Sequence, residues 1–143
     1  MKVRDIAKLN PLDLQTITPD RPVHEAIGRL VEHNIGALPV CDSAGELVGI
    51  LTERDILRLC AGQDLTAVME QSVADAMTTN LIIGVPDDTV AYVMQVMTER
   101  RIRHLPILED RKLVNIVSIG DVVKAKLDES SSEIRFLRDY LTQ

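Results

Sequence analysis

The sequence predicts a mixed α/β (α+β) fold in which one unit of helices and strands occurs twice and a further helix closes the chain. Three observations support this prediction: an internal repeat, an alternation of helix-type and strand-type hydrophobic spacing, and a composition suited to an aliphatic core. Of the 143 residues, 45% are hydrophobic but only 2% are aromatic. Such a chain is expected to form a soluble globular protein with a core of Val, Ile, Leu, Met and Ala.

The internal repeat relates the two halves of the chain. Residues 18–23 match residues 85–90, so that Pro19 and Pro86 lie 67 positions apart, 86 minus 19. After one deleted residue near Ala44 the offset becomes 66. The matched pairs include Leu38 with Leu105, Pro39 with Pro106, Thr52 with Ser118, Asp55 with Asp121, and the openings 3–5 with 73–75.

The first copy predicts the order helix, strand, turn, strand, helix. Apolar residues recur at helical spacing over 23–31, and Pro22 suits the start of that helix. The short β-branched runs 38–40 and 47–51 predict strands, and residues 42–46 between them are turn-like. A unit of this size cannot bury both faces of its sheet alone, so the two copies are expected to pack on each other.

The second copy repeats this order. Helical spacing returns over 90–97, the runs 105–108 and 113–117 predict strands, and residues 109–112 form the turn. The predicted boundaries are 1–67 for the first repeat, 68–128 for the second repeat and 129–143 for the closing helix.

The closing helix is predicted from its start signal and its apolar spacing. Residues 130–133, Ser-Ser-Ser-Glu, fit a capping box, and Ile134, Leu137 and Leu141 follow at helical spacing. Because an apolar stripe on a terminal helix more often packs on its own protein than on a partner, ordinary packing is expected here.

The charge balance argues against nucleic acid as a partner. The formal net charge is -6 and the sequence pI is about 5.0, whereas a nucleic-acid-binding protein normally presents a basic face. The one basic run comprises Arg100, Arg101, Arg103 and His104, and it fits a solvated helix end as well as a ligand site. No secretory signal and no run long enough to span a membrane is present. We therefore expect a cytoplasmic protein with neither a DNA partner nor a membrane partner.

Neither a metal site nor a redox site is predicted. Cys41 and Cys60 lie 19 positions apart, 60 minus 41, without the CxxC spacing of zinc sites or redox dithiols. Free thiols are therefore expected. His24 and His33 occur on a helical segment, where solvent-facing side chains are more common than metal ligands.

The ends of the last strand in each copy carry the residues of greatest chemical interest. Residues 52–55, Thr-Glu-Arg-Asp, and 118–121, Ser-Ile-Gly-Asp, each follow an apolar strand and open an apolar helix. A helix start offers unpaired N–H groups to a phosphate, and a carboxylate can accept from the two hydroxyls of a ribose. The same pattern is also a capping box that needs no ligand. Its occurrence twice in register favours a ligand role.

These residues and their surroundings resemble the cystathionine-β-synthase (CBS) domain family in its tandem form, the Bateman module. The resemblance covers residues 3–126 and rests on segments 36–40, 47–56, 103–107 and 113–122. Residues 97–124 and 133–137 further resemble the stand-alone bacterial CBS-pair proteins, which carry no fused effector domain. The family implies two βαββα CBS repeats packed with pseudo-twofold symmetry, a homodimer shaped as a flat disc, and two clefts for AMP, ADP, ATP, NAD(H) or S-adenosylmethionine.

In such pairs each cleft joins the hydroxyl and the Asp of one repeat to the first strand of the other. The resemblance implies one cleft with Ile116, Ser118, Gly120, Asp121, Leu14, Gln15, Ile35, Gly36 and Ala37. It implies a second cleft with Ile50, Thr52, Arg54, Asp55, Asn80, Leu81, Ile82 and Ile102. Arg103 and His104 match positions that face phosphates near the centre of the pair.

The two clefts are expected to differ in affinity or in ligand. Asn115 stands where the first copy has Gly49, which changes the local shape of the second strand. The uncharged pair 36–37 stands where the second copy has Arg103 and His104.

Three functions compete for this sequence. The first is a homodimeric sensor that requires no cofactor, binds an adenosyl nucleotide and modulates an unknown protein target in trans. The second is a ligand-independent dimerisation or protein-interaction module in which the paired residues only cap helices. The third is an enzyme built on Ser118, His104 and Asp121, which is disfavoured because Ser118 lies in no Gly-x-Ser-x-Gly elbow.

Overall fold

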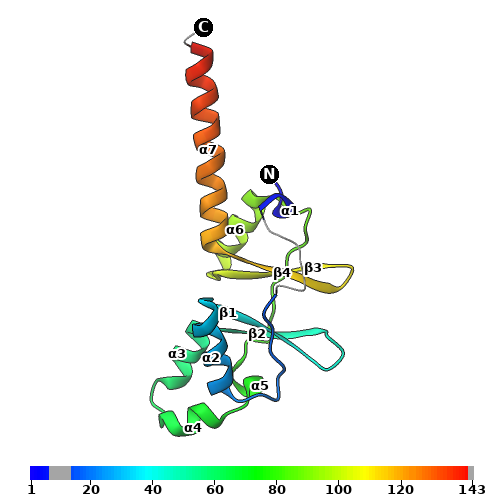
Figure 1. Ribbon diagram of the computed structural model, residues 1–143, viewed down its shortest axis with the longest axis vertical. Coiled ribbons are helices and arrows are strands. Elements are labelled where there is room, and N and C mark those ends of the chain that lie inside the picture. Colours follow the sequence, from blue (N-terminus) through cyan, green and yellow to red (C-terminus); the bar gives the residue numbers. More distant parts are fainter. Residues whose placement is uncertain (7–13, 142–143) are drawn as a thin grey trace. The chain divides into compact units, whose positions relative to one another are not determined.

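The computed structural model describes residues 1–6 and 14–141 (Figure 1). Helices and strands follow each other as the repeat predicts, which confirms the mixed fold. The chain forms two compact units: unit 1 consists of Met1–Asn10, Ile83–Glu109 and Val114–Gln143, and unit 2 consists of Pro11–Ile82 and Asp110–Leu113. The boundaries 1–67 and 68–128 of the two repeats stay a prediction, and the predicted closing helix 129–143 is taken up below.

Unit 2 is built around an antiparallel strand pair. Its elements are α2 (Val23–His33), β1 (Ala37–Cys41), β2 (Leu47–Thr52), α3 (Glu53–Cys60), α4 (Leu65–Glu70) and α5 (Val73–Ala76). α2 begins directly after Pro22, as predicted, and ends at Asn34, which adopts the left-handed conformation at φ 52°. Leu38 lies opposite Leu51 in the β1–β2 pair.

The core of unit 2 is aliphatic, as the composition predicts. α2 packs on β1, and α5 packs on both α2 and β2. The buried cluster comprises Ile17, Ala26, Leu30, Leu38, Val40, Leu51 and Val73. Burial of this apolar surface is the main stabilising contribution available to the unit.

Unit 1 contains the corresponding elements of the second copy. They are α1 (Val3–Ile6), α6 (Val90–Arg100), β3 (His104–Glu109), most of β4 (Lys112–Ser118) and α7 (Ile119–Leu141), with β3 and β4 paired. Thr89 caps α6 by accepting from the backbone N of Tyr92 at 3.1 Å. Arg101 ends α6 in the left-handed conformation at φ 54°.

The first strand of each repeat is reduced to a single parallel bridge. Ile17 pairs with Val40 in unit 2, and Gly84 pairs with Ile107 in unit 1. Gly84 N donates to Pro106 O at 2.8 Å. A Cβ on Gly84 would lie 3.0 Å or less from the side chains of β3, so glycine allows the backbone to approach this strand.

The opening helix of the first repeat completes unit 1. α1 opens the first repeat in sequence, yet Val3 N donates to Asp88 O at 2.9 Å and Arg4 N donates to Pro86 O at 3.0 Å. Val3 is 0% exposed in this position. α1 is therefore anchored at the start of the second copy's long helix.

The opening helix of the second repeat completes unit 2 in the same manner. Val73 N donates to Arg21 O at 2.8 Å, and Ala74 N donates to Pro19 O at 3.0 Å. Val73 is also 0% exposed. The two repeats thus exchange their opening helices, and the backbone hydrogen bonds are equivalent under the offset of the repeat.

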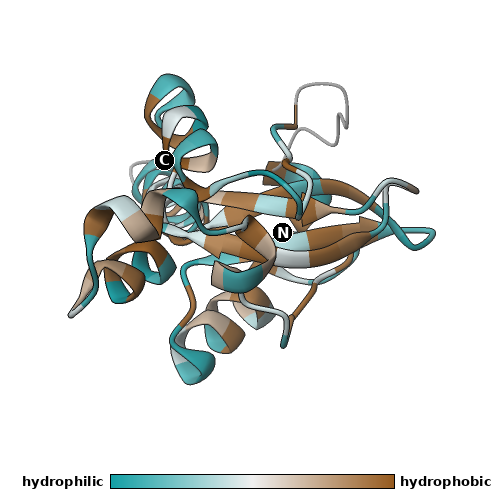
Figure 2. Ribbon diagram, turned by 90° about the horizontal axis from the view of Figure 1, so that it is seen from below, coloured by the Kyte–Doolittle hydropathy of each residue, from teal (hydrophilic) through white to brown (hydrophobic). Residues whose placement is uncertain are grey.

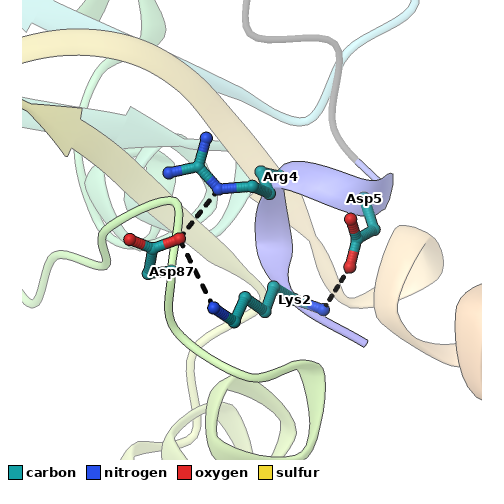
Figure 3. A network of polar contacts seen from close by, with 4 residues as sticks. All are labelled: Lys2, Arg4, Asp5 and Asp87. Atoms are coloured by element: carbon teal, nitrogen blue, oxygen red, sulfur yellow. Dashed lines mark hydrogen bonds and ion pairs between the residues drawn. The ribbon is translucent and has the colours of Figure 1, made fainter.

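Ion pairs add to the anchoring of α1 (Figure 3). Arg4 Nε lies 2.8 Å from Asp87 Oδ1, and Lys2 Nζ lies 3.7 Å from the same oxygen. The hydrogen bond and charge of Arg4 lower the pKa of Asp87, and Asp87 in turn raises the pKa of Arg4. Because these groups are exposed, the ion pairs orient α1 more than they stabilise it.

The end of the chain differs from the prediction. α7 runs without a break from Ile119 to Leu141, so residues 130–133 lie inside the helix and do not cap a new one. Only Val122 and Ala125 of α7 are buried, where the helix packs on α6 and α1. The stripe Ile134, Leu137 and Leu141 is 56%, 57% and 80% exposed, so the expectation that it packs on this protein is wrong.

Hydropathy follows the elements that build each core. In Figure 2 the strands are largely brown and the turns that join them are largely teal. Among the described residues, no helix combines the length and the apolar character that a membrane crossing requires.

The exchange of opening helices predicts a stability cost at Val73. Val73→Ala removes buried methyl groups and leaves a cavity, so the free energy of unfolding should fall by about 2 kcal/mol in urea denaturation. Val85→Ala is the matched control because Val85 is 45% exposed, and its effect should stay within about 0.5 kcal/mol. Equal losses in both variants would contradict the packing role of α5.

Candidate ligand site at the strand ends

In unit 2 the predicted hydroxyl and carboxylate meet where β2 becomes α3. Thr52 Oγ1 accepts from Asp55 N at 3.2 Å, and Asp55 Oδ2 accepts from Thr52 N at 3.0 Å. These reciprocal bonds form a complete capping box. Both side chains are thereby held at the first turn of α3, where unpaired N–H groups and the helix dipole favour a negative charge.

A third residue, Thr78, completes this site and was not predicted from the sequence. Its hydroxyl donates to Asp55 Oδ1 at 3.0 Å, so each carboxylate oxygen of Asp55 has one donor. Thr78 also exchanges backbone hydrogen bonds with Ile50 at 2.8 and 3.0 Å. In the sequence, Thr78 is marked only by its position two residues before the predicted site residue Asn80. That position does not reveal a hydrogen bond to Asp55, which lies 23 residues away.

Gly49 allows Thr78 to come this close. A Cβ at Gly49 would lie 2.5 Å from Met77 Sδ and 3.1 Å from Thr78 O. Any side chain at this position must therefore displace Met77 or the backbone that carries Thr78. The glycine of β2 thus serves the site by making room for the segment that follows α5.

In unit 1 the same arrangement recurs where β4 becomes α7. Asp121 Oδ2 accepts from Ser118 N at 2.9 Å, and Ser118 Oγ accepts from Asp121 N at 3.1 Å. No donor to Asp121 Oδ1 occurs among residues 1–6 and 14–141, in contrast to Asp55. Asp121 is exposed whereas Asp55 is half-buried.

The loop before the first strand of each pair lies against the helix start. Glu53 N donates to Gly36 O at 3.0 Å in unit 2, and Ile119 N donates to Arg103 O at 2.8 Å in unit 1. Arg103 is exposed and His104 is half-buried at the start of β3. The equivalent positions, Gly36 and Ala37, carry no charge, so the two helix starts have different electrostatic surroundings.

The substitution of Gly49 by Asn115 also gives the two strands different local contacts. Asn115 Oδ1 accepts from the neighbouring Ile116 N at 2.7 Å, so the side chain folds back on its own strand. Gly49 instead faces Met77 and Thr78. The two strand-end sites therefore differ in the contacts of the strand that leads to each Asp, as well as in the charges nearby.

The structure brings together three residues of the second predicted cleft. Ile50, Thr52 and Asp55 lie beside Thr78, and residues 80–82 follow Thr78 within the same unit. Arg54 and Asn80 are exposed, while Leu81 and Ile82 are half-buried. Pairings between residues of different units, which include Ile102 and the whole first cleft, stay predictions. Their members are Leu14, Gln15, Ile35, Gly36, Ala37, Ile116, Ser118, Gly120 and Asp121.

The described residues offer little support for a metal site or for a reactive cysteine. Within residues 1–6 and 14–141, no group of three or more His, Cys, Asp or Glu side chains could hold a metal ion. Cys41 and Cys60 are free, and burial raises the pKa of the Cys41 thiol. A raised pKa favours the protonated, less nucleophilic form of this cysteine.

Comparison with known proteins assigns the chain to a family. The profile of the CBS domain matches residues 3–62 and 73–128, which include both strand-end motifs. The chain belongs to the CBS domain family. It is 39% identical over 128 residues to the mitochondrial CBS domain-containing protein CBSX3 of Arabidopsis thaliana, an alignment that covers 87% of this chain and 62% of that protein. The chain thus spans less than two thirds of this relative.

Solved structures of CBS-domain proteins share the fold. ATU1752 from Agrobacterium tumefaciens is 42% identical with a TM-score of 0.81, over 87% of this chain and 92% of that one. CBSX2, solved in complex with AMP, is 29% identical with a TM-score of 0.75, over 90% and 98% of the two chains. The CBS domain pair of MJ0100, solved with 5-methylthioadenosine and S-adenosyl-L-methionine, is 30% identical with a TM-score of 0.77, also over 90% and 98%. The predicted family is confirmed.

The close approach at Gly49 predicts opposite effects of two glycine substitutions. Gly49→Ala should lower the free energy of unfolding by about 1–3 kcal/mol, because its Cβ overlaps Met77. Gly28→Ala in α2 meets nothing within 4 Å and should raise it by about 0.5–1 kcal/mol through helix propensity. Thermal and urea unfolding would measure both. A neutral Gly49→Ala variant would contradict the role assigned to this glycine.

Proposed function

We propose that this chain is a regulatory module that binds an adenosyl nucleotide at the strand ends of its CBS repeats and thereby changes the state of a partner. The observation that carries the proposal is the duplicated pair of hydroxyl and carboxylate, held by equivalent hydrogen bonds at the first turns of α3 and α7. The AMP complex of CBSX2 and the adenosyl complexes of MJ0100 support an adenosyl ligand for this family.

The carboxylates suit the ribose of such a ligand. An ionised carboxylate has about four lone-pair sites, so Asp121 can retain its bond from Ser118 N and still accept from a hydroxyl. Each carboxylate oxygen of Asp55 accepts one hydrogen bond and has a second lone pair that can accept another from a ribose hydroxyl. Because the capping bonds already hold each carboxylate in place, little conformational entropy is lost when the ribose binds.

The helix starts and the nearby cations suit the phosphates. The first turns of α3 and α7 present N–H groups and positive dipole ends. Arg54 belongs to the first site, whereas Arg103 and His104 belong to the second repeat. The two sites therefore differ in phosphate chemistry, and we propose that they differ in the preferred ligand among AMP, ADP, ATP, NAD(H) and S-adenosylmethionine.

The proposal includes a homodimer that regulates a protein target in trans in the cytoplasm. An apolar groove of about 390 Å³ on unit 2 supports self-association; it lies between α2 and α3 and is lined by Ile27, Leu30, Val31, Asn34, Ile35, Glu53 and Ile56. A ligand can shift such a partner only by binding two states of the assembly with different affinity. We propose no catalytic role for Ser118, His104 or Asp121.

The second candidate function is a ligand-independent interaction module. One observation favours it: both capping boxes are complete without a ligand, and capping alone explains the spacing of Thr or Ser to Asp. The two candidate functions predict different results for an Asp→Asn substitution in a capping box, which removes the charge but keeps a hydrogen-bond acceptor. Only the nucleotide-binding module should lose ligand affinity.

Calorimetry with AMP, ADP, ATP, NAD, NADH and S-adenosylmethionine tests the proposal. Asp121→Asn keeps an amide oxygen for Ser118 N but removes the charge, so one binding event should weaken roughly 10-fold to 100-fold, the equivalent of about 1.5–3 kcal/mol. Asp55→Asn should weaken the other event. When the ligand concentration is about 100 times the dissociation constant, the free energy of unfolding of the wild-type protein should rise by roughly 2.7 kcal/mol.

The matched control is Asp64→Asn. Asp64 caps α4 by accepting from Thr66 N at 3.3 Å and belongs to neither strand-end motif. This variant should bind every ligand as the wild type does. The interaction-module function is favoured instead if no adenosyl compound binds the wild type while Asp121→Ala lowers stability by about 1 kcal/mol.

A further inference from the structure

The C-terminal half of α7 carries a hydrophobic seam that nothing in unit 1 covers. In Figure 1 this half of the helix extends beyond α6 and α1. Its residues from 131 to 141 are all exposed. The exposed apolar positions of the seam are Val123, Leu127, Ile134, Leu137 and Leu141.

The spacing of the seam is that of a coiled coil. Steps of four and three alternate through Val123, Leu127, Ser130, Ile134, Leu137 and Leu141. Leu127, Ile134 and Leu141 thus occupy the first heptad position, a, and Val123, Ser130 and Leu137 occupy the fourth, d. A strict repeat of this kind favours a left-handed supercoil with another helix.

The seam points away from the part of α7 that packs on unit 1. At 3.6 residues per turn, the buried Val122 and Ala125 lie on the opposite side of the helix from Leu127 and Ile134. Docking of α7 on α6 and α1 therefore leaves the seam accessible along its whole length. Phe136 is also exposed but occupies position c, outside the seam, whereas the exposed Tyr140 flanks the seam at position g.

The flanking charges identify the partner helix. Position g of one heptad contacts position e of the following heptad on a parallel partner. Here g is Glu133 and the matching e is Arg138, so two parallel copies place opposite charges together on both sides of the seam. Neither side chain has an ion-pair partner within residues 1–6 and 14–141. One heptad of the seam, with Ile134 at a and Leu137 at d, has the combination that favours two strands.

We infer that residues 123–141 of α7 form a parallel two-stranded coiled coil with a second copy of this chain. The contact is separate from the strand-end sites, and the inference does not depend on nucleotide binding. It joins the α7 helices of two chains. A second self-contact at the groove between α2 and α3 would then produce a larger assembly, of which the coiled coil is one interface.

Sedimentation of full-length variants tests this interface. Ile134→Glu with Leu137→Glu should reduce the mass of the assembly to half that of the wild type, because both glutamates enter the seam. Ser132→Glu with Phe136→Glu is the matched control: these exposed residues occupy positions f and c, away from the seam and its flanks, so the same charge is added to this half of α7 and the mass should equal that of the wild type. A monomeric wild type, a seam variant of unchanged mass, or an equal loss in the control would overturn the inference.

Charge reversal tests the parallel orientation. Glu133→Arg and Arg138→Glu should each weaken self-association several-fold, since each brings like charges together. The combined exchange should restore the affinity of the wild type, because each g position then again faces an opposite charge. A combined variant that associates no better than the single variants would refute the parallel pairing. The exposed positions leave the fold intact, which circular dichroism checks for every variant.

Discussion

The exchange of opening helices between the two repeats is the constraint on which the rest of the structure depends. Val3 and Val73 are fully buried, each in the unit formed mainly by the other repeat. Backbone hydrogen bonds from α1 and α5 fix these helices at the starts of α6 and α2. A consequence for function follows from chain continuity. Because α5 is held in unit 2, the residues directly after it reach β2, where Thr78 meets Ile50 and Asp55. The strand-end site of unit 2 thus exists because a segment of the second repeat is packed on the first.

At the strand ends, helix capping and ligand binding are compatible functions of the same atoms. The capping bonds use one oxygen of each Asp and hold the carboxylate at a helix start. That position is favourable for an anion and leaves acceptor capacity for a diol. The two units then diverge through Thr78 and Gly49 beside Asp55 and through Asn115, Arg103 and His104 in the second repeat. The two strand-end sites therefore share one backbone arrangement but have different neighbouring side chains.

Local periodicity predicted the parts of the fold that local forces determine. The repeat, α2, α6, the strand pairs and both capping boxes follow from residue spacing within a few turns. The exchange of α1 and α5 was not predicted, since nothing in residues 3–5 or 73–75 encodes which unit they join. Thr78 was missed for the same reason, because its partner Asp55 is distant in sequence. The error at residues 130–133 has a different cause: Ser and Glu also fit a helix interior, so a capping pattern alone does not mark a helix start.

The central claim is that adenosyl ligands bind where β2 meets α3 and β4 meets α7. The most direct measurement is the amide NMR spectrum of the full chain during titration with AMP. Binding at the strand ends should give saturable shifts centred on residues 52–55 and 118–121 and on Thr78, with little change along residues 127–141 of α7. A spectrum that does not change at saturating AMP, or one whose shifts avoid both strand ends, would contradict it.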